Sequence, residues 1–209
     1  MKNAKYPYLV LSIVIVLMMS NTFNSVLAYS GFPDVPLDSP YAYEVGILKE
    51  AGIFLGDEKG NFNPNNVMTR AEAATLLVRV FLGDNVASSG RSSFKDVSTK
   101  HWASPYIEAA VSGGMINGYG DGRFGPGDAL TYNQAVTLLI RCIGYEDIAQ
   151  IYGGWPYGYI DLAEVLGVTE NTIFLGDEPV RRSTVAVLVF NTLFARSQYN
   201  IDDLLYDGS

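Results

Sequence analysis

An internal repeat constrains this sequence more than any other feature. Residues 32–79 can be placed over residues 94–141 at a constant offset of 62 residues without a gap, and 14 positions are then identical. Chance would supply only about three identities at ordinary residue frequencies. A repeat of this length predicts several copies of one supersecondary unit that together bury a shared core.

The identical positions mark the same succession of elements in both copies. Each copy opens with Phe-x-Asp-Val, continues through apolar residues spaced as on one helix face, and reaches a turn that contains Gly-x-Phe-x-Pro. The glycines permit the left-handed backbone of tight turns, and a second apolar helix follows the turn. Ser39-Pro40 is a suitable N-cap and first-turn pair for the first helix. Each unit is therefore predicted to be helix, turn, helix.

A capping box is predicted at the start of the second helix of each copy. Thr69 with Glu72, and Thr131 with Gln134, have the required three-residue spacing. Arg70 has no part in the box, and the helix dipole slightly disfavours a cation there. Arg70 is therefore either a surface residue or part of an anion site, in which its guanidinium and free helix N–H groups bind one acidic ligand.

A third, shorter copy follows the first two. Trp155, Tyr159, Ile160, Ala163 and Gly167 match Trp102, Tyr106, Ile107, Ala110 and Gly114 at an offset of 53 residues.

The second half of this copy is ambiguous, because residues 173–178 repeat residues 53–58 letter for letter. We prefer to pair Phe174 with Phe62, because this keeps the eight-residue distance to Arg182 that Phe62 has to Arg70.

Three such units predict one mainly α fold. A single unit of about 60 residues buries too little surface to be stable alone. The apolar second helices, residues 73–81, 135–143 and 185–194, are the natural shared centre. We therefore expect three tandem helix-loop-helix repeats packed as a pseudo-threefold assembly around a central helical bundle, with grooves between neighbouring units as functional surfaces.

The beginning of the chain predicts export. Lys2 and Lys5 precede an apolar run at residues 9–19, which is too short to span a bilayer. A polar stretch follows and ends at residues 26–28, with small residues at the positions that signal peptidase requires. We predict a signal peptide at residues 1–28, with a retained uncleaved anchor as the alternative. Cleavage would change the net charge from −8 to −10, which argues against nucleic acid binding. The single cysteine, Cys142, cannot form a disulfide within the chain and is expected to be buried.

The repeated Phe-x-Asp-Val, the aromatic-led helix, the Gly-x-Phe-x-Pro turn and Thr-Arg-Ala-Glu resemble S-layer homology modules. On this resemblance the modules are residues 29–88, residues 89–150 and, in divergent form, residues 151–195, with an acidic tail or linker at 196–209. The resemblance implies a secreted protein at the cell wall or S-layer surface of a Gram-positive-type cell. It also implies non-covalent binding to the secondary cell-wall polymer, often through pyruvylated amino sugars in the grooves, without a cofactor or metal.

The resemblance also implies which residues bind the ligand. The family's motif arginine falls on Arg70 and Arg182, its aspartate on Asp34 and Asp96, and its groove tryptophan on Trp102 and Trp155. Arginine offers bidentate donors to an acidic group, and a tryptophan face packs on a sugar ring. Two structural alternatives remain open: that the aspartates cap turns, and that the tryptophans belong to the core.

The chain departs from the family pattern in each unit. Tyr132 stands where the second unit's arginine belongs, Pro40 where the first unit's tryptophan belongs, and Thr184 where the third unit's glutamate belongs. The three grooves are therefore expected to bind unequally, and the groove that uses Tyr132 is expected to be weak or idle.

The expected function is a non-catalytic cell-surface anchor that binds an acidic secondary cell-wall polysaccharide. Alternatives are a self-assembling or protein-docking S-layer component without carbohydrate binding, and a wall-active enzyme with a glycosidase-like carboxylate pair. The glycine-rich residues 118–122 lack the context of a dinucleotide loop and the ligand spacing of a calcium loop, and the surroundings of His101 do not resemble a catalytic triad. A C-terminal cargo domain or other surface proteins are further expected partners, and both a free-standing protein and the N-terminal part of a longer one remain open. No membrane association is expected after signal cleavage.

Overall fold

The computed structural model of the protein describes residues 31–86 and 90–198 and is mainly α-helical. The predicted signal peptide lies outside the described residues, as does most of the predicted tail at 196–209. The first three residues of that tail are helical and belong to α9, which ends later than expected. The helices of the described part are α3 (Ala42–Glu50), α4 (Arg70–Phe81), α5 (Ser104–Ser112), α6 (Tyr132–Cys142), α7 (Glu146–Ile151), α8 (Tyr157–Val165) and α9 (Arg182–Gln198). This confirms the predicted fold class.

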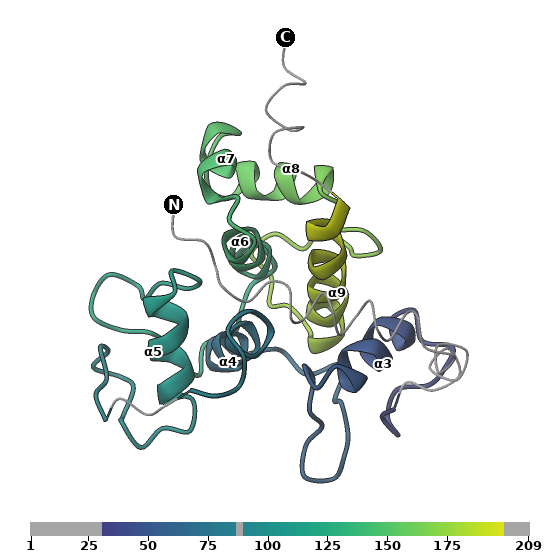
Figure 1. The fold of residues 1–209 in the computed structure, drawn as a ribbon, viewed down its shortest axis with the longest axis horizontal. Helices are drawn as coiled ribbons and strands as arrows, with labels where there is room; N and C mark the ends of the chain where they lie inside the picture. The colour runs from purple at the N-terminus through teal and green to yellow at the C-terminus, as the bar shows by residue number, and fades with distance from the viewer. Residues whose placement is uncertain (1–30, 87–89, 199–209) are drawn as a thin grey trace.

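The second helices of the three units, α4, α6 and α9, lie together at the centre, and the other helices surround them (Figure 1). Each first helix packs against the second helix of another unit. Helix α5 packs on α4, α8 packs on α6, and α3 packs on α9. The units are therefore interlocked, and each one completes the core of its neighbour.

Three backbone hydrogen bonds join the units in a closed ring at the centre. The N–H of Met68 donates to the carbonyl of Val180 at 3.0 Å, that of Val180 to Leu130 at 2.8 Å, and that of Leu130 to Met68 at 2.8 Å. All three side chains are buried. Such a ring is expected at the axis of a pseudo-threefold assembly, although the symmetry of the whole assembly stays a prediction.

The starts of α4 and α6 carry capping boxes. Thr69 Oγ1 accepts a hydrogen bond from the Glu72 N–H at 3.3 Å, and Glu72 Oε2 accepts one from the Thr69 N–H at 2.8 Å. Thr131 and Gln134 make the same pair of bonds at 3.3 Å each. These boxes satisfy N–H groups that no helical carbonyl can reach.

The predicted start of the first helix at Ser39-Pro40 is wrong. Helix α3 begins at Ala42, and its N-cap residue, Tyr41, makes no side-chain capping bond. Successive turns occupy the preceding residues, where the Ser39 N–H donates to the Pro36 carbonyl and the Ala42 N–H donates to the Ser39 carbonyl, each at 3.0 Å. The Ser-Pro pair therefore belongs to a turn and not to the helix.

The backbone contacts between units settle the register of the third copy. Three N–H groups at equivalent helix positions donate to carbonyls in the turn of the following unit: Ala71 to Pro126, Asn133 to Gly176, and Ser183 to Pro64. Gly176 thus takes the place of Pro64 and Pro126. Phe174, two residues earlier, corresponds to Phe62 and Phe124, as the preferred pairing predicted.

Helix α7 has no counterpart in the other units and was not predicted. It packs on α8, where Gly158 approaches it so closely that an added Cβ would overlap the Ala149 carbonyl oxygen. Cys142, which was expected to be buried, is partly exposed at the end of α6. Within residues 31–86 and 90–198, no helix has both the length and the apolar character that a membrane crossing requires.

Candidate functional site

The helix N–H groups that were expected to bind an anion are already occupied. At the start of α4, the N–H of Arg70 donates to the Asp128 carbonyl at 2.9 Å and that of Ala71 donates to the Pro126 carbonyl at 3.1 Å. Helix α9 repeats this arrangement with carbonyls of the first unit. The expectation of free N–H groups at these positions is therefore wrong, because the turn of the neighbouring unit satisfies them.

Arg70 lies inside the contact between the first and second units and is only 4% exposed. Its Nε donates to the Phe124 carbonyl at 2.8 Å, and its Nη2 donates to the Asn117 carbonyl at 2.7 Å. The guanidinium carbon lies 4.6 Å from the ring centre of Tyr119 and 4.8 Å from that of Phe124. Burial lowers the pKa of Arg70. These contacts make the side chain a link between units.

Arg182 occupies the equivalent position between the third and first units but is more accessible. Its side chain is 16% exposed, and its Nε donates to the Phe62 carbonyl at 2.9 Å. The nearest carboxylate contact of its Nη1 is Glu72 Oε1, at 3.8 Å, which is too long for a hydrogen bond. Burial lowers the pKa of Arg182 as well, but the group stays cationic at neutral pH. Among the described residues, its Nη atoms therefore have no hydrogen-bond partner.

A groove of about 270 Å³ opens beside Arg182, and all three units contribute to its walls. We call it the Arg182 groove. Its lining includes the loop residues Phe54, Gly56 and Asp57 and the α4 residues Glu72, Leu76 and Arg79 from the first unit, Trp102 from the second, and Arg182 from the third. It combines guanidinium groups, carboxylates and aromatic surface, which is a suitable lining for a charged sugar.

The two tryptophans are on the surface and not in the core. The side chains of Trp102 and Trp155 are 59% and 56% exposed. Trp102 precedes α5, stacks on His101 at 5.7 Å and reaches the Arg182 groove. The sequence alternative that placed these tryptophans in the core is therefore excluded.

Asp34 and Asp96 hold the glycine-rich turns. The two carboxylate oxygens of Asp34 accept from the N–H groups of Phe62 and Asn63, at 2.7 and 2.6 Å. Asp96 accepts from Phe124 and Gly125 at 2.8 Å each. Desolvation raises the pKa of Asp96, but these two bonds, its own N–H and the charge of Arg123 together hold the pKa below its usual value. Both aspartates thus cap turns, and ligand binding by them stays a prediction.

Tyr132 fills the third equivalent position without a cation. Its ring is 1% exposed and packs edge-on against Phe174, with 5.7 Å between ring centres. Its hydroxyl forms a 2.9 Å hydrogen bond with Thr172 Oγ1 of the third unit. Among the described residues, Tyr132 places no guanidinium at this junction, and the weakness of that groove stays a prediction.

Arg79 is a groove residue that the sequence analysis did not single out. It lies on the same face of α4 as Glu72, seven residues further on, and its Nε donates to Asp84 at 3.1 Å. The Tyr106 hydroxyl donates to the same carboxylate at 2.8 Å. Arg79 matches Arg141 in the repeat, and this identity was the only signal in the sequence that could have found it.

Comparisons with known proteins agree with this fold. The family model of the S-layer homology domain matches residues 31–74 and 93–136. A cell surface protein of Thermoanaerobacter kivui is 32% identical over 196 residues, which cover 92% of this chain and 25% of that protein. A surface-layer 125 kDa protein of Lysinibacillus sphaericus is 30% identical over 179 residues, 78% of this chain and 14% of its own length.

A third relative bears a different name. A protein of Bacillus anthracis named as an uncharacterized cell wall amidase is 32% identical over 104 residues, 49% of this chain and 19% of its own length. The chain thus spans a quarter or less of the length of these curated relatives.

The interlocked helical units and the groove between them define a helical repeat protein with a groove at its unit boundaries. The chain belongs to the S-layer homology domain family, with matched domains at two positions. It is a protein of the cell wall and cell surface. By their contacts, α8, α9 and the turn between them form a further repeat of the same unit. The limits of this third module at residues 151–195 and its assignment to the family stay predictions.

Proposed function

We propose that this chain is a non-catalytic anchor that binds an acidic secondary cell-wall polysaccharide in the Arg182 groove. A role at the cell surface follows from the family and its relatives. The ligand and its site are the proposal. One observation carries it: the Arg182 guanidinium has unpaired Nη atoms at a groove that also exposes the face of Trp102.

The chemistry of the groove fits a sugar that bears a carboxylate. A guanidinium can donate two parallel hydrogen bonds to one carboxylate, such as that of a pyruvyl ketal. The indole face of Trp102 covers the apolar side of a sugar ring. Glu72 and Asp57 also line the groove, and the whole chain is acidic, so attraction must come from these directed contacts and not from the overall field.

Cosedimentation with purified cell walls tests the site. Arg182→Met keeps most of the apolar stem but removes the charged donors. We expect the apparent Kd to rise roughly 30- to 150-fold, since a hydrogen bond to a charged group contributes about 2–3 kcal/mol. Arg181→Met is the matched control, because Arg181 is adjacent and exposed and its Nη1 donates to Asn65 Oδ1 at 3.3 Å. Equal binding by the two variants would remove Arg182 from the site.

Trp102→Ala tests the sugar-stacking face separately. The side chain is 59% exposed, so its loss should leave stability nearly unchanged while it weakens wall binding. Undiminished binding by this variant would show that the ligand does not lie along the Arg182 groove.

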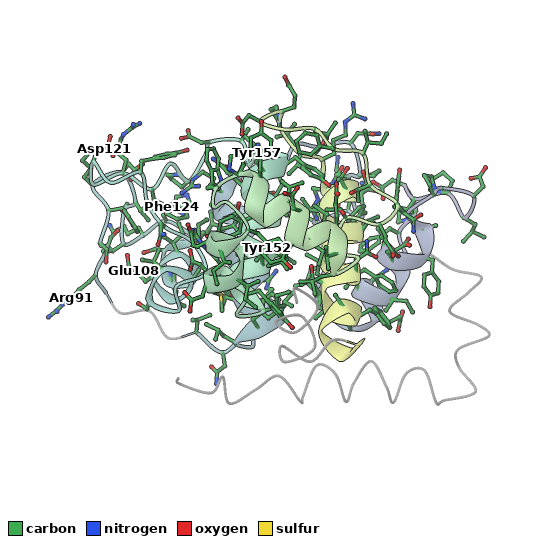
Figure 2. The ribbon with its side chains drawn as sticks, turned by 90° about the horizontal axis from the view of Figure 1, so that it is seen from above. Arg91, Glu108, Asp121, Phe124, Tyr152 and Tyr157 are labelled. Carbon is green, nitrogen blue, oxygen red and sulfur yellow. The ribbon has the colours of Figure 1, made fainter. Side chains whose placement is uncertain are left out.

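The alternative function, docking to other surface proteins, is favoured by exposed apolar side chains on α7 and at the start of α8. Ile151 is 77% exposed, Tyr157 69% and Tyr152 44%, and Figure 2 shows both tyrosines beside these helices. Walls stripped of their secondary polymer separate the two functions. Binding should disappear under our proposal and persist if protein docking is responsible.

The proposal includes the absence of catalysis, the module limits at residues 29–88, 89–150 and 151–195, and a cargo domain or other surface protein as a further partner. The relative named as an amidase makes catalysis worth testing directly. Incubation of the chain with walls should release neither soluble sugar nor peptide. Release of sugar or peptide that increases with time and with the concentration of the chain would contradict the proposal.

A further inference from the structure

The repeat predicts a second groove, at the boundary between the first and second units, with nearly the same components as the Arg182 groove. Arg70 takes the place of Arg182, Trp155 that of Trp102, and Arg141 that of Arg79. Trp155 is as exposed as Trp102, at 56% against 59%. Gln134 replaces Glu72, so this groove lacks one carboxylate that opposes anion binding. By composition alone, the second groove should bind an acidic sugar at least as well as the first.

One side chain makes the two grooves different. Tyr119 lies 4.6 Å from the Arg70 guanidinium carbon on one side and 5.5 Å from that of Arg123 on the other. Its hydroxyl donates to Asp128 Oδ2 at 2.9 Å, which fixes the ring in place. Burial, together with this bond to a carboxylate, raises the pKa of Tyr119. The ring therefore covers Arg70, which is only 4% exposed although Tyr119 itself is 43% exposed.

The first groove has no tyrosine at the equivalent position. The Arg182 guanidinium carbon lies 5.5 Å from the ring centre of Phe54 and 5.2 Å from that of Phe62, and its side chain is still 16% exposed. At the offset of 62 residues, the position of Tyr119 is occupied by Asp57, which is exposed. The Asp57 carboxylate is turned to its own loop, where it accepts from the Asn63 side-chain amide at 2.9 Å and from the Lys59 and Asn61 N–H groups. Because the Asp57 side chain is short and bonds to its own loop, it does not cover the Arg182 guanidinium, which stays open to the groove.

We propose that Tyr119 closes the Arg70 groove and thereby limits the chain to one acidic-sugar site, and that removal of its ring opens a second site of the same ligand class. This inference rests on the proposed function of the Arg182 groove. In the wild type, where Tyr119 covers it, Arg70 only links two units. In a variant without the Tyr119 ring, Arg70 also binds an anion. Its Nε and Nη2 stay bonded to carbonyls in both cases, and its Nη1 is the donor that becomes accessible.

Titration calorimetry with soluble, size-fractionated secondary cell-wall polymer tests this inference. The wild-type chain should bind one polymer fragment, and Tyr119→Asp, which copies the residue of the open groove, should bind two. Tyr119→Phe is the matched control, because it keeps the ring and loses only the bond to Asp128. It should still bind one fragment.

A combined variant separates this inference from the proposed function. Arg182→Met should bind no fragment, and Arg182→Met with Tyr119→Asp should bind one again through Arg70. If the wild type binds one fragment and Arg182→Met binds none, but the combined variant does not regain binding, only the closure by Tyr119 is overturned. If the wild type binds none, both proposals fail. Two fragments bound to the wild type would also overturn the closure.

Arginine modification gives a readout that needs no ligand. Phenylglyoxal reacts with accessible guanidinium groups, and peptide mass spectrometry locates the adducts. Arg70 should be protected in the wild type and in Tyr119→Phe, and modified at a rate comparable to Arg182 in Tyr119→Asp. Retained helical circular dichroism shows that the variant is folded. Rapid modification of Arg70 in the folded wild type would show that Tyr119 does not cover it.

Discussion

Arg70 and Arg182 share one position in the repeat, yet the structure predicts opposite consequences for their loss. Arg70→Met removes two hydrogen bonds from a buried cation to the Phe124 and Asn117 carbonyls, at 2.8 and 2.7 Å, and leaves both acceptors without that donor. Each such bond contributes about 1.5–3 kcal/mol. Because removal of the charge also relieves the cost of its burial, we expect a net loss of about 3 kcal/mol.

Arg182→Met should cost much less stability. It loses one hydrogen bond, to the Phe62 carbonyl at 2.9 Å, from a guanidinium that is partly exposed. The expected loss is about 1 kcal/mol. For a domain of this size, 1 kcal/mol changes the melting temperature by about 2–4 °C. Arg70→Met should therefore melt roughly 6–12 °C below the wild type, and Arg182→Met only about 2–4 °C below it.

Thermal unfolding followed by circular dichroism, paired with wall cosedimentation well below the melting temperature, checks both halves of this prediction. Arg70→Met should be unstable but bind walls normally, whereas Arg182→Met should be stable but bind poorly. The reasoning is refuted if Arg182→Met is the less stable of the two. It is also refuted if folded Arg70→Met loses wall binding, because Arg70 would then contact the ligand in the wild type.

Three further perturbations test the loops and the packing. A hydrogen bond from the Asn63 amide, with others from its own loop, lowers the pKa of Asp57 to about 2 from its ordinary 3.8, so its stabilising effect is present above the ordinary value and lost as the pH falls through about 2. The difference in melting temperature between the wild type and Asp57→Asn should therefore shrink between about pH 5 and pH 2, and a constant difference would contradict this. Gly158→Ala places a Cβ against the Ala149 carbonyl and should cost about 3 kcal/mol in chemical denaturation, whereas Gly127→Ala, with open space around it, should stay within about 0.5 kcal/mol. Tyr159→Phe removes a buried hydroxyl with two hydrogen bonds and should cost about 1 kcal/mol in the same assay, and no change would mean that these bonds are replaced by water.

The parts of the fold that depend on local sequence could be predicted. The capping boxes at Thr69 and Thr131 depend only on residues three apart, and the helices that follow them were expected from their apolar runs. The repeat supplied the interlocked arrangement in outline, because a unit of this size needs partners to bury its apolar face. The mainly α class followed from these two observations.

The features that depend on how the units meet could not be predicted. The N–H groups of Arg70 and Ala71 at the start of α4 looked free because their acceptors, the Asp128 and Pro126 carbonyls, are 58 and 55 residues away in the chain. No sequence pattern indicated that Tyr119 covers Arg70, since the two residues are 49 positions apart in the chain. Helix α7 was missed because it has six residues and no copy elsewhere in the repeat. The motif repeated within the chain therefore identified equivalent positions, but it did not show that Arg70 and Arg182 differ in their solvent exposure.

The ring through Met68, Leu130 and Val180 has a consequence for the architecture of the chain. Each unit contacts the next, and the third unit contacts the first, so no unit has an unpaired contact surface at this ring. A solenoid, in contrast, has two terminal repeats and needs capping repeats there. A fourth copy could not join without breaking the circle, and deletion of one copy would strand a donor and an acceptor in its two neighbours. The packing then does not depend on which copy comes first along the polypeptide. A circular permutant that begins with the second copy should therefore fold into the same closed arrangement of three units.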